Sequence, residues 1–373
     1  MLENIFDPNN FLFWILVIGI LAGIITFVFR SSLAYFKFVY PNAKFEAMGN
    51  PFLTEKELTR VFGSKDITNF KELLNTLRDY KVTGDTIYEL QHSLDQHFIQ
   101  TIEMMRKDSS KKMDDFFDIY LEKLDFYLIK NALKKRLNDE KIDEKIVEES
   151  NTQTTKKLLF KLLNCKKEEI PLILKNNGFT KEVIVASSAE KVDFLALDAT
   201  LDKYIIKKFK QLKVPQKCEK GKQKFVNYVV DTLNIKNILR VKHIGYDNES
   251  CYKLFLGEGQ ELAYWKFKQI CEATLISEVV SILAGTSFYN PLKDALENYN
   301  KEKSTQILEN ALDIQFLKII RDISIENYNT IGPTLRFIIS KEFEIKNLKI
   351  IEKGIGEGFP SDLIQKFVIM GGK

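Results

Sequence analysis

The chain has 373 residues, and its 55 Lys and Arg residues nearly balance its 51 Asp and Glu residues, which leaves a net charge of +4. This length is enough for two or three ordinary domains, and the balanced charge is unlike the clustered basic surface of a nucleic-acid-binding protein. Gly and Pro are sparse, and strand and hairpin patterns are few, so the sequence predicts an all-α protein with no nucleic-acid partner.

The first predicted element is an apolar helix at residues 11–30. Residues 11–29 carry no charged side chain, and as a helix they reach about 28 Å, close to the hydrocarbon thickness of a bilayer. Acidic residues precede this segment and basic residues follow it: Glu3 and Asp7, then Arg30, Lys37 and Lys44. A cleaved secretory signal would have a basic front and a shorter apolar run. The positive-inside rule therefore predicts a transmembrane helix in the cell membrane, with residues 1–10 outside and the main body in the cytoplasm.

Two glycines lie within this predicted membrane helix. Gly19 and Gly23 have the Gly-x-x-x-Gly spacing, which lets another helix or a lipid approach closely. We expect them to be packing positions in the membrane.

The soluble part begins at about residue 35 and soon reaches a second predicted helix. Thr54 and Glu57 have the spacing of a capping box, so this helix should begin directly after Thr54. Further along, residues 138–170 are rich in Lys and Glu and are predicted to form an exposed helical insertion.

The most informative pattern is the tripeptide Ile-Lys-Asn, which occurs three times in apolar patterns of helical period. The copies begin at Ile129, Ile235 and Ile345, at nearly constant spacing. Such spacing predicts an internal repeat. Asn is a poor residue in the middle of a helix, so its recurrence favours a buried polar contact between helices, although an exposed position on a solvated face stays open. We predict that these motifs are structural joints, built from Asp125, Lys130, Asn131, Asp231, Lys236, Asn237, Lys346 and Asn347.

A second repeated pattern helps to define the units. Thr76 and Tyr80, Thr200 and Tyr204, and Thr286 and Tyr289 are each followed by a long amphipathic segment, and each is predicted to mark a turn. The resulting repeats cover residues 35–119, 120–227 and 228–336, and residues 337–373 form a closing half-repeat. We expect this last segment to pack against the first repeat and close the structure into a ring.

The sequence offers no catalytic, cofactor-binding or metal-binding constellation. Its three histidines are scattered, and the four cysteines share no ligand spacing, so buried free thiols in a reducing compartment are expected. Gly354, Gly356 and Gly358 resemble a nucleotide-binding fragment, but they follow a helix rather than a strand, which favours a helix end and a turn. The sequence therefore predicts a protein that is not an enzyme.

These residues resemble one known family. The resemblance is carried by Asn42-Ala-Lys44, the Thr76 to Tyr80 turn, Asp231-x-x-Asn-Ile-Lys-Asn237 and above all Lys341-Glu-Phe-Glu-Ile-Lys-Asn-Leu348. Together they look like the C subunit of the archaeal A-type ATP synthase, whose eukaryotic counterpart is the d subunit of the vacuolar proton pump. The family usually has arginines near the first motif, where this chain has Lys44 and Glu46, so no arginine contact is transferred.

The resemblance implies an all-helical funnel of three similar parts around a pseudo-threefold axis. It also implies a function without catalysis: a central-stalk component, one copy per complex, that couples the membrane rotor ring to the central axle so that an ion gradient drives ATP synthesis. The implied partners are the rotor-ring and axle subunits. The alternative is a membrane-anchored helical-repeat scaffold that binds other protein partners.

Overall fold

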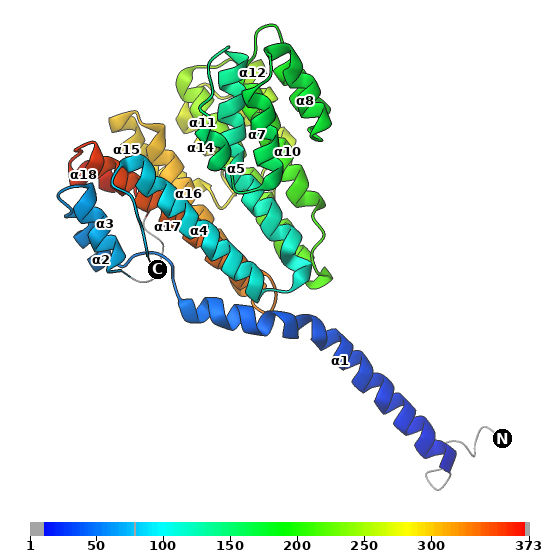
Figure 1. Cartoon of the computed structure of the whole chain (residues 1–373). Coiled ribbons are helices and arrows are strands. Elements are labelled where there is room, and N and C mark those ends of the chain that lie inside the picture. Colours follow the sequence, from blue (N-terminus) through cyan, green and yellow to red (C-terminus); the bar gives the residue numbers. More distant parts are fainter. Residues whose placement is uncertain (1–10, 78–79, 370–373) are drawn as a thin grey trace.

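The computed structural model describes residues 11–77 and 80–369, and all regular secondary structure in these ranges is helical (Figure 1). This confirms the predicted all-α class. The α-helices are α1 (Phe11–Met48), α2 (Glu55–Phe62), α3 (Ile67–Asn75), α4 (Ile87–Asp108), α5 (Asp114–Leu137), α6 (Lys145–Glu148), α7 (Gln153–Leu163), α8 (Ile170–Asn176), α9 (Lys181–Ser187), α10 (Phe194–Gln211), α11 (Glu219–Ile244), α12 (Asn248–Lys253), α13 (Tyr264–Glu272), α14 (Ile276–Ile282), α15 (Tyr289–Glu302), α16 (Thr305–Glu326), α17 (Gly332–Gly356) and α18 (Ser361–Gln365). Short 3-10 segments precede α5, α8 and α11: η2 (Lys111–Met113), η3 (Lys167–Glu169) and η4 (Gln216–Cys218). The predicted extracytoplasmic residues 1–10 lie outside the described ranges.

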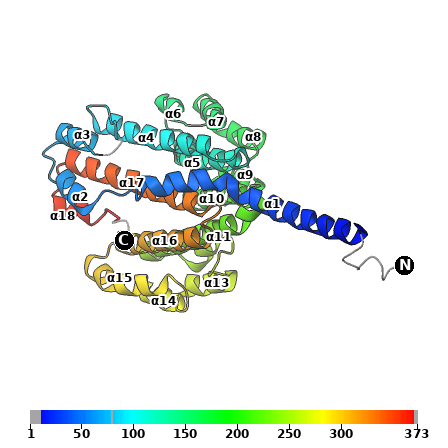
Figure 2. The same cartoon turned by 90° about the horizontal axis from the view of Figure 1, so that it is seen from below.

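The long helices α4, α5, α10, α11, α16 and α17 form the centre of the body. Each packs on the next in this order, and α17 packs back on α4, so the set closes on itself. Figure 2 shows α17 between α4 and α16. Large apolar side chains from these helices are fully buried and fill the space between them, among them Phe116, Tyr120, Leu201, Val230, Ile320 and Ile338. Burial of such side chains is the main stabilising contribution to the body.

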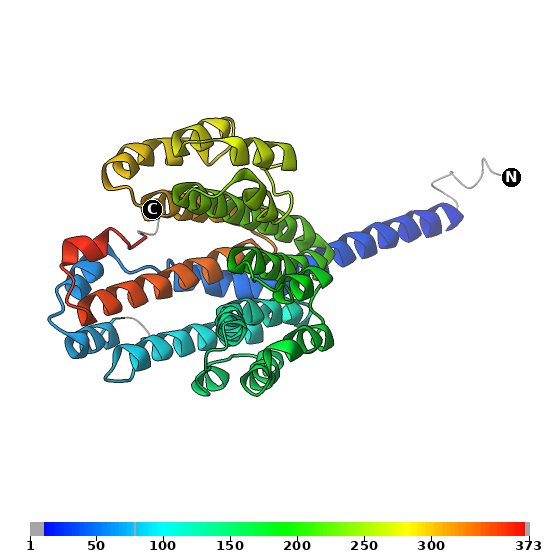
Figure 3. The same cartoon turned by 90° about the horizontal axis from the view of Figure 1, so that it is seen from above.

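Shorter helices form an outer layer on this central set. α7 and α9 pack on α5 and α10, whereas α14 and α15 pack on α11 and α16, and these two groups lie on opposite sides of the body (Figure 3). The predicted exposed insertion at residues 138–170 is therefore partly wrong. Leu158, Leu159 and Leu162 of α7 are buried, because α7 lies with one apolar face against α5.

The predicted contact between the end of the chain and the start of the soluble part is confirmed. α17 packs on α1, α2 and α3. A carboxylate oxygen of Glu344 accepts a hydrogen bond from the backbone N–H of Leu53 at 3.1 Å, and the Ser361 hydroxyl donates to the Phe62 carbonyl at 3.3 Å. Residues near the two ends of the sequence are thus in direct contact, which holds α17 and α18 against the start of the soluble part.

Helix α1 has two halves with different surroundings. Its first half is the only helix in the described ranges that is long and apolar enough to cross a membrane, and none of its apolar window is buried in the body. Its second half packs on α17 and α4. Figure 1 shows α1 lying along one end of the body and then bending away from it. The predicted membrane segment and the start of the soluble part are therefore one continuous helix.

Two short sequence patterns, the capping box and the Thr/Tyr motif, can be compared with the helices that the structure shows. The capping box at Thr54 and Glu57 is present and begins α2, as predicted. Thr76 lies at the end of α3 and Thr286 lies between α14 and α15, outside helices as predicted. Thr200 lies inside α10, so the prediction of a turn at Thr200 is wrong. In all three copies the Thr hydroxyl donates to a Leu carbonyl three residues earlier. This hydrogen bond can form within a helix as well as at its end, so the motif alone does not define a turn.

Candidate functional site

The central helices enclose a pocket of about 390 Å³. It is lined by α5, α10, α11, α16 and α17, and most of its wall is apolar, with aromatic residues such as Phe126, Phe209 and Phe343. Charged side chains also reach it: Lys123, Lys130, Asp202, Lys236, Asp313, Glu342 and Lys346. An apolar wall with a few charged groups is typical of a site that holds part of another molecule.

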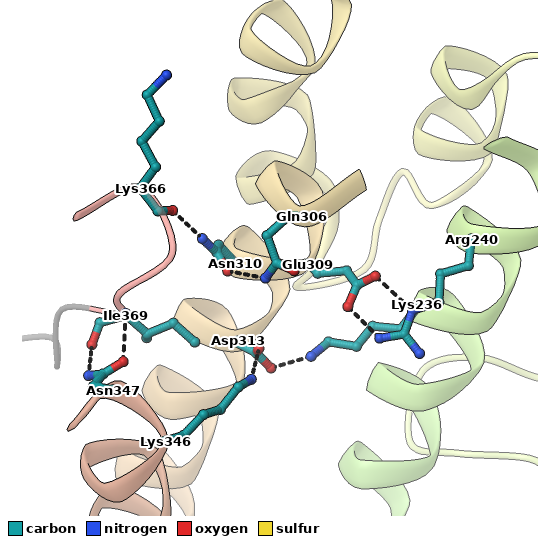
Figure 4. A network of polar contacts seen from close by, with 10 residues as sticks. All are labelled: Lys236, Arg240, Gln306, Glu309, Asn310, Asp313, Lys346, Asn347, Lys366 and Ile369. Carbon is teal, nitrogen blue, oxygen red and sulfur yellow. Dashed lines mark hydrogen bonds and ion pairs between the residues drawn. The ribbon is translucent and has the colours of Figure 1, made fainter. Parts of the chain in front are cut away.

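The lysines of the three Ile-Lys-Asn motifs converge on this pocket. The Lys130 ammonium lies 2.7 Å from an Asp202 carboxylate oxygen, which joins α5 to α10. Lys236 lies 2.5 Å and Lys346 3.4 Å from the two oxygens of Asp313, so one carboxylate of α16 bridges α11 and α17. Figure 4 shows Asp313 between the two ammonium groups. The structure thus brings together three predicted joint residues from three different helices.

The α11–α16 contact is the most deeply buried of these. The side chains of Lys236 and Asp313 are 12% and 5% exposed. Burial lowers the pKa of Lys236, and the neighbouring Asp313 carboxylate opposes this shift. One turn away, Arg240 donates two hydrogen bonds to Glu309, at 2.7 and 2.5 Å, so a bidentate pair extends the same contact.

Three Asp–Lys ion pairs join neighbouring central helices. Asp95 of α4 pairs with Lys349 of α17 at 2.6 Å, in the way that Asp202 pairs with Lys130 and Asp313 with Lys236. In this series of ion pairs, Lys349 of α17 takes the part that Lys236 takes on α11, whereas Lys346 of the tripeptide binds the second oxygen of Asp313. Lys346 lies three residues before Lys349, which is nearly one helical turn. Both side chains therefore lie on a similar face of α17.

Asn234 and Asn347 are separated by the same number of residues as Lys236 and Lys349, and both make similar contacts. The Asn347 side-chain amide accepts from the Ile369 backbone N–H at 2.9 Å and donates to its carbonyl at 2.7 Å. Asn234 accepts from the N–H of Leu256 at 2.9 Å and donates to the carbonyl of Gly257 at 3.0 Å. Each amide thus holds non-helical backbone beyond the next helix of the chain, after α12 for Asn234 and after α18 for Asn347.

The expectation of a buried contact at all three motif asparagines is wrong. Only Asn347 is buried, whereas Asn237 is half-buried and Asn131 is exposed. Asn131 lines a surface pocket with Lys135 and Lys145 instead of a helix contact. Sequence reasoning missed Asn234, the buried amide of this motif, which binds loop backbone rather than another helix, because it lay outside the matched tripeptide.

Asp125 and Asp231 bind loop backbone instead of a side chain on a neighbouring central helix. Both are fully buried. Asp125 accepts hydrogen bonds from the backbone N–H groups of residues 151 and 152, each at 2.9 Å. Asp231 accepts from three consecutive N–H groups, of residues 260 to 262, at 2.8 to 3.1 Å. Burial raises the pKa of Asp231 to about 6, although these three donors act to lower it. Asp125 of α5 therefore fastens the α6–α7 loop, and Asp231 of α11 fastens the α12–α13 loop.

Gly259 explains why this loop can come so close to Asp231. A Cβ at this position would lie 1.8 Å from a carboxylate oxygen of Asp231. Only glycine allows that approach. The predicted membrane positions differ completely: at Gly19 and Gly23 a Cβ would meet nothing within 4 Å, so they face open space in the described structure.

Sequence reasoning also missed the acidic half of each ion pair. Asp95, Asp202 and Asp313 recur at nearly constant spacing, a signal as regular as that of the lysines. The described residues contain no group of three or more side chains suited to holding a metal ion. The charged groups around the pocket bind one another across helix contacts, an arrangement that stiffens the body and leaves an apolar wall for a partner.

A closed set of long helices, cross-linked by ion pairs around an apolar pocket, defines a class of helical structural and interaction subunits. Residues 41–367 match the ATP synthase (C/AC39) subunit family, and the chain belongs to that family. It is therefore a non-catalytic subunit of an A-type ATP synthase, a membrane-associated rotary complex, and not an enzyme.

Archaeal relatives resemble the chain over nearly its whole length. It is 27% identical to the A-type ATP synthase C subunit of Methanobrevibacter smithii, over 95% of this chain and 93% of the relative. It is 25% identical to the corresponding C subunits of Methanosphaera stadtmanae and Methanocaldococcus jannaschii, each over 97% of this chain and over 96% and 94% of those relatives. The similarity thus includes the body and most of α1.

Proposed function

We propose that this chain is the central-stalk component that couples the membrane rotor ring of an A-type ATP synthase to the central axle, so that an ion gradient drives ATP synthesis. One copy per complex serves this purpose. The observation that carries the proposal is the closed set of central helices around an apolar pocket. A coupling element must transmit torque without deforming, and a closed set has no free helix edge at which it could open.

The body is a three-fold pseudo-repeat in the form of a funnel. The equivalent pairs of Asp95 with Lys349, Asp202 with Lys130 and Asp313 with Lys236 support this symmetry. The repeat boundaries at residues 119, 227 and 336 fall inside α5, α11 and α17. Successive units therefore share a long helix, and a load on one unit passes directly to the next.

The pocket inside the funnel is the seat of the axle subunit. Its aromatic wall can accept an apolar segment, and the surrounding ion pairs keep the wall rigid. The lysines there are already paired with carboxylates, so they do not select for a strongly acidic partner. We therefore expect an apolar helix end with a polar, nearly neutral edge to fill the site.

Helix α1 anchors this protein in the cell membrane, with residues 1–10 outside and the body in the cytoplasm. The unburied apolar window of α1 and the basic residues Arg30 and Lys37 after it support this topology. The open faces of Gly19 and Gly23 would allow close approach of the ring or its lipids. The alternative is an anchored scaffold that binds other partners. Such a scaffold would need an open concave surface, and the closed set of helices does not favour it.

Purification of the tagged full-length chain from detergent-solubilised membranes tests the function. We expect rotor-ring and axle subunits to co-purify in the wild type. Val229→Asp, which puts a charge on the pocket wall, should lose the axle subunits and keep the ring. Val185→Asp, on an exposed position of α9, is the matched control and should keep both. Purification without any ATPase subunit would favour the scaffold alternative.

A further inference from the structure

The second half of α1 is held to the body by one face. The Asn42 side-chain amide donates to the carbonyls of Tyr328 and Thr330, at 2.7 and 3.0 Å. The ring of Phe45 stacks on that of Phe337, with centroids 5.6 Å apart, and Lys44 pairs with Asp108 at 2.6 Å. These contacts fix the rotation of the helix about its own axis, so the opposite face has a defined direction.

The opposite face is apolar and uncovered. Phe36, Val39 and Tyr40 are 61%, 59% and 62% exposed, and Ala43 and Ala47 continue the same line. Their spacing of three and four residues puts all five on one side of the helix. We call them the outer stripe. A soluble protein rarely leaves a continuous apolar line of this length in water, so the outer stripe requires an occupant.

Continuity of the helix indicates what that occupant is. α1 has 38 residues and is therefore about 57 Å long, far longer than the roughly 30 Å hydrocarbon core that its apolar half can cross. The bend in Figure 1 separates the projecting half from the half that lies along the body. Tyr35, Phe36 and Tyr40, with Arg30 and Lys37, follow the apolar run directly. Aromatic and basic residues are enriched at this depth of a bilayer.

The end of the body around the outer stripe carries the same chemistry. The α10–α11 connection lies beside α1, because the Lys217 ammonium sits 5.4 Å from the centroid of the Tyr35 ring. The α4–α5 connection is next to Lys44 through Asp108. Exposed lysines occur on both connections and in the first turn of α11: Lys111, Lys112, Lys213, Lys217 and Lys220. Ile325 and Tyr328, at the end of α16, are also exposed there.

We propose that the outer stripe binds the surface of an anionic lipid bilayer. The apolar side chains enter the boundary between headgroups and acyl chains, and the lysines of the two connections contact the anionic headgroups. α1 then crosses the membrane, bends at its surface and lies there with the body fastened to its inner face. This inference rests on the membrane-spanning role of α1 and adds that the lipid surface itself orients the body.

Single cysteines carrying an environment-sensitive fluorophore test this in the full-length chain. The native Cys165, Cys218, Cys251 and Cys271 are buried and should not be labelled. The labelled chain is reconstituted, without other subunits, in vesicles of phosphatidylcholine and phosphatidylglycerol. Quenching by brominated lipids reports contact with the bilayer, and quenching by iodide reports contact with water.

Three label positions separate the outcomes. Ile20→Cys reports the membrane segment, Val39→Cys the outer stripe and Val185→Cys a distant exposed surface. We expect brominated lipids to quench the first two labels and iodide alone to quench the third. Omitting phosphatidylglycerol should reduce the lipid quenching at Val39 and leave that at Ile20 unchanged, because only the surface contact uses the lysines.

Two results would overturn the inference in distinguishable ways. Lipid quenching at Ile20 with full iodide quenching at Val39 would leave α1 as a membrane anchor whose outer stripe does not touch lipid. Iodide quenching at both positions would also contradict the membrane-spanning role. A Val39 label that becomes protected only in the assembled complex, and that crosslinks to a ring subunit, would assign the outer stripe to a protein partner instead.

Discussion

The α11–α16 contact and the α5–α10 contact carry the same kind of ion pair in different surroundings. In the first, Lys236 and Asp313 are 12% and 5% exposed, whereas in the second Lys130 and Asp202 are 21% and 26% exposed. Asp313 also bridges to Lys346 of α17, while Asp202 binds one lysine in the described structure. Ion pairs of the same kind therefore need not contribute equally to the free energy of unfolding, because the contribution of each pair depends on its burial.

The difference has a mechanical consequence. A buried charge is stabilised only by its ion-pair partner, because water cannot reach it. In an exposed pair, water can take the place of either partner. The α11–α16–α17 region should thus be the rigid part of the body, and the α5–α10 contact the part that yields first under load. Mutations in equivalent pairs can break or sharpen this comparison.

The largest effect is expected from Asp313→Ala. The change leaves Lys236 buried without its carboxylate and also removes the bridge to Lys346. Loss of one partner of a buried pair costs about 3–5 kcal/mol of unfolding free energy. Urea unfolding followed by circular dichroism measures the loss. Lys346→Ala, at the more exposed partner, is the matched control and should cost much less. Equal losses for both variants would contradict the importance of burial.

Asp202→Ala tests the equivalent position in the other contact. Lys130 keeps access to water when its partner is removed, so the expected loss is about 1–2 kcal/mol, between an exposed and a buried pair. The same urea titration measures it. A loss as large as that of Asp313→Ala would mean that the two contacts are energetically equivalent despite their different exposure.

The α4–α17 contact offers a pH-dependent test. Glu352 is fully buried, and burial raises its pKa from 4.5 to about 7, although a hydrogen bond from Gln91 acts to lower it. The folded state therefore holds a proton that the unfolded state has lost between these pH values. Stability should fall as the pH rises through this window, by at most about 1.4 kcal/mol per pH unit.

Glu352→Gln removes this titration. We expect the variant to lose less stability than the wild type when thermal unfolding is compared at the two ends of the window. Glu357→Gln, at an exposed position of the same helix end, is the control and should follow the wild type. An unchanged pH dependence in Glu352→Gln would show that other groups cause it.

The smallest effect is expected at the outer end of the α5–α10 contact. Lys134 and Asp198 lie 2.6 Å apart, but their side chains are 39% and 28% exposed. Exposed pairs contribute roughly 0.2–1 kcal/mol and weaken in salt. Lys134→Ala should thus change the urea midpoint only slightly, and added salt should remove the difference. A loss comparable to that of Asp313→Ala would overturn the ranking of the contacts.

Prediction from the sequence succeeded where a local signal and its physical cause coincide. The apolar period predicts helices, and Thr54 and Glu57 predict the start of α2. Both signals are local and do not depend on the register of a repeat.

Prediction failed where register decides the outcome. A shift of three residues returns to nearly the same side of a helix, so the tripeptide pattern does not distinguish Lys346 from Lys349, which pairs with Asp95. Asn131 then appeared equivalent to Asn347, although one is exposed and the other buried. The acids Asp202 and Asp313 lie on neighbouring helices, and only the packing shows that they meet the lysines.

We propose that the pocket inside the closed helices holds the axle subunit. This contact is tested most directly by crosslinking from Val229→Cys, on the pocket wall, in purified ATP synthase, with Val185→Cys on the outer surface as the control. We predict a crosslinked product that contains the axle subunit from Val229 and none from Val185. An intact complex in which Val229→Cys never reaches the axle subunit would contradict the proposed coupling role of the pocket.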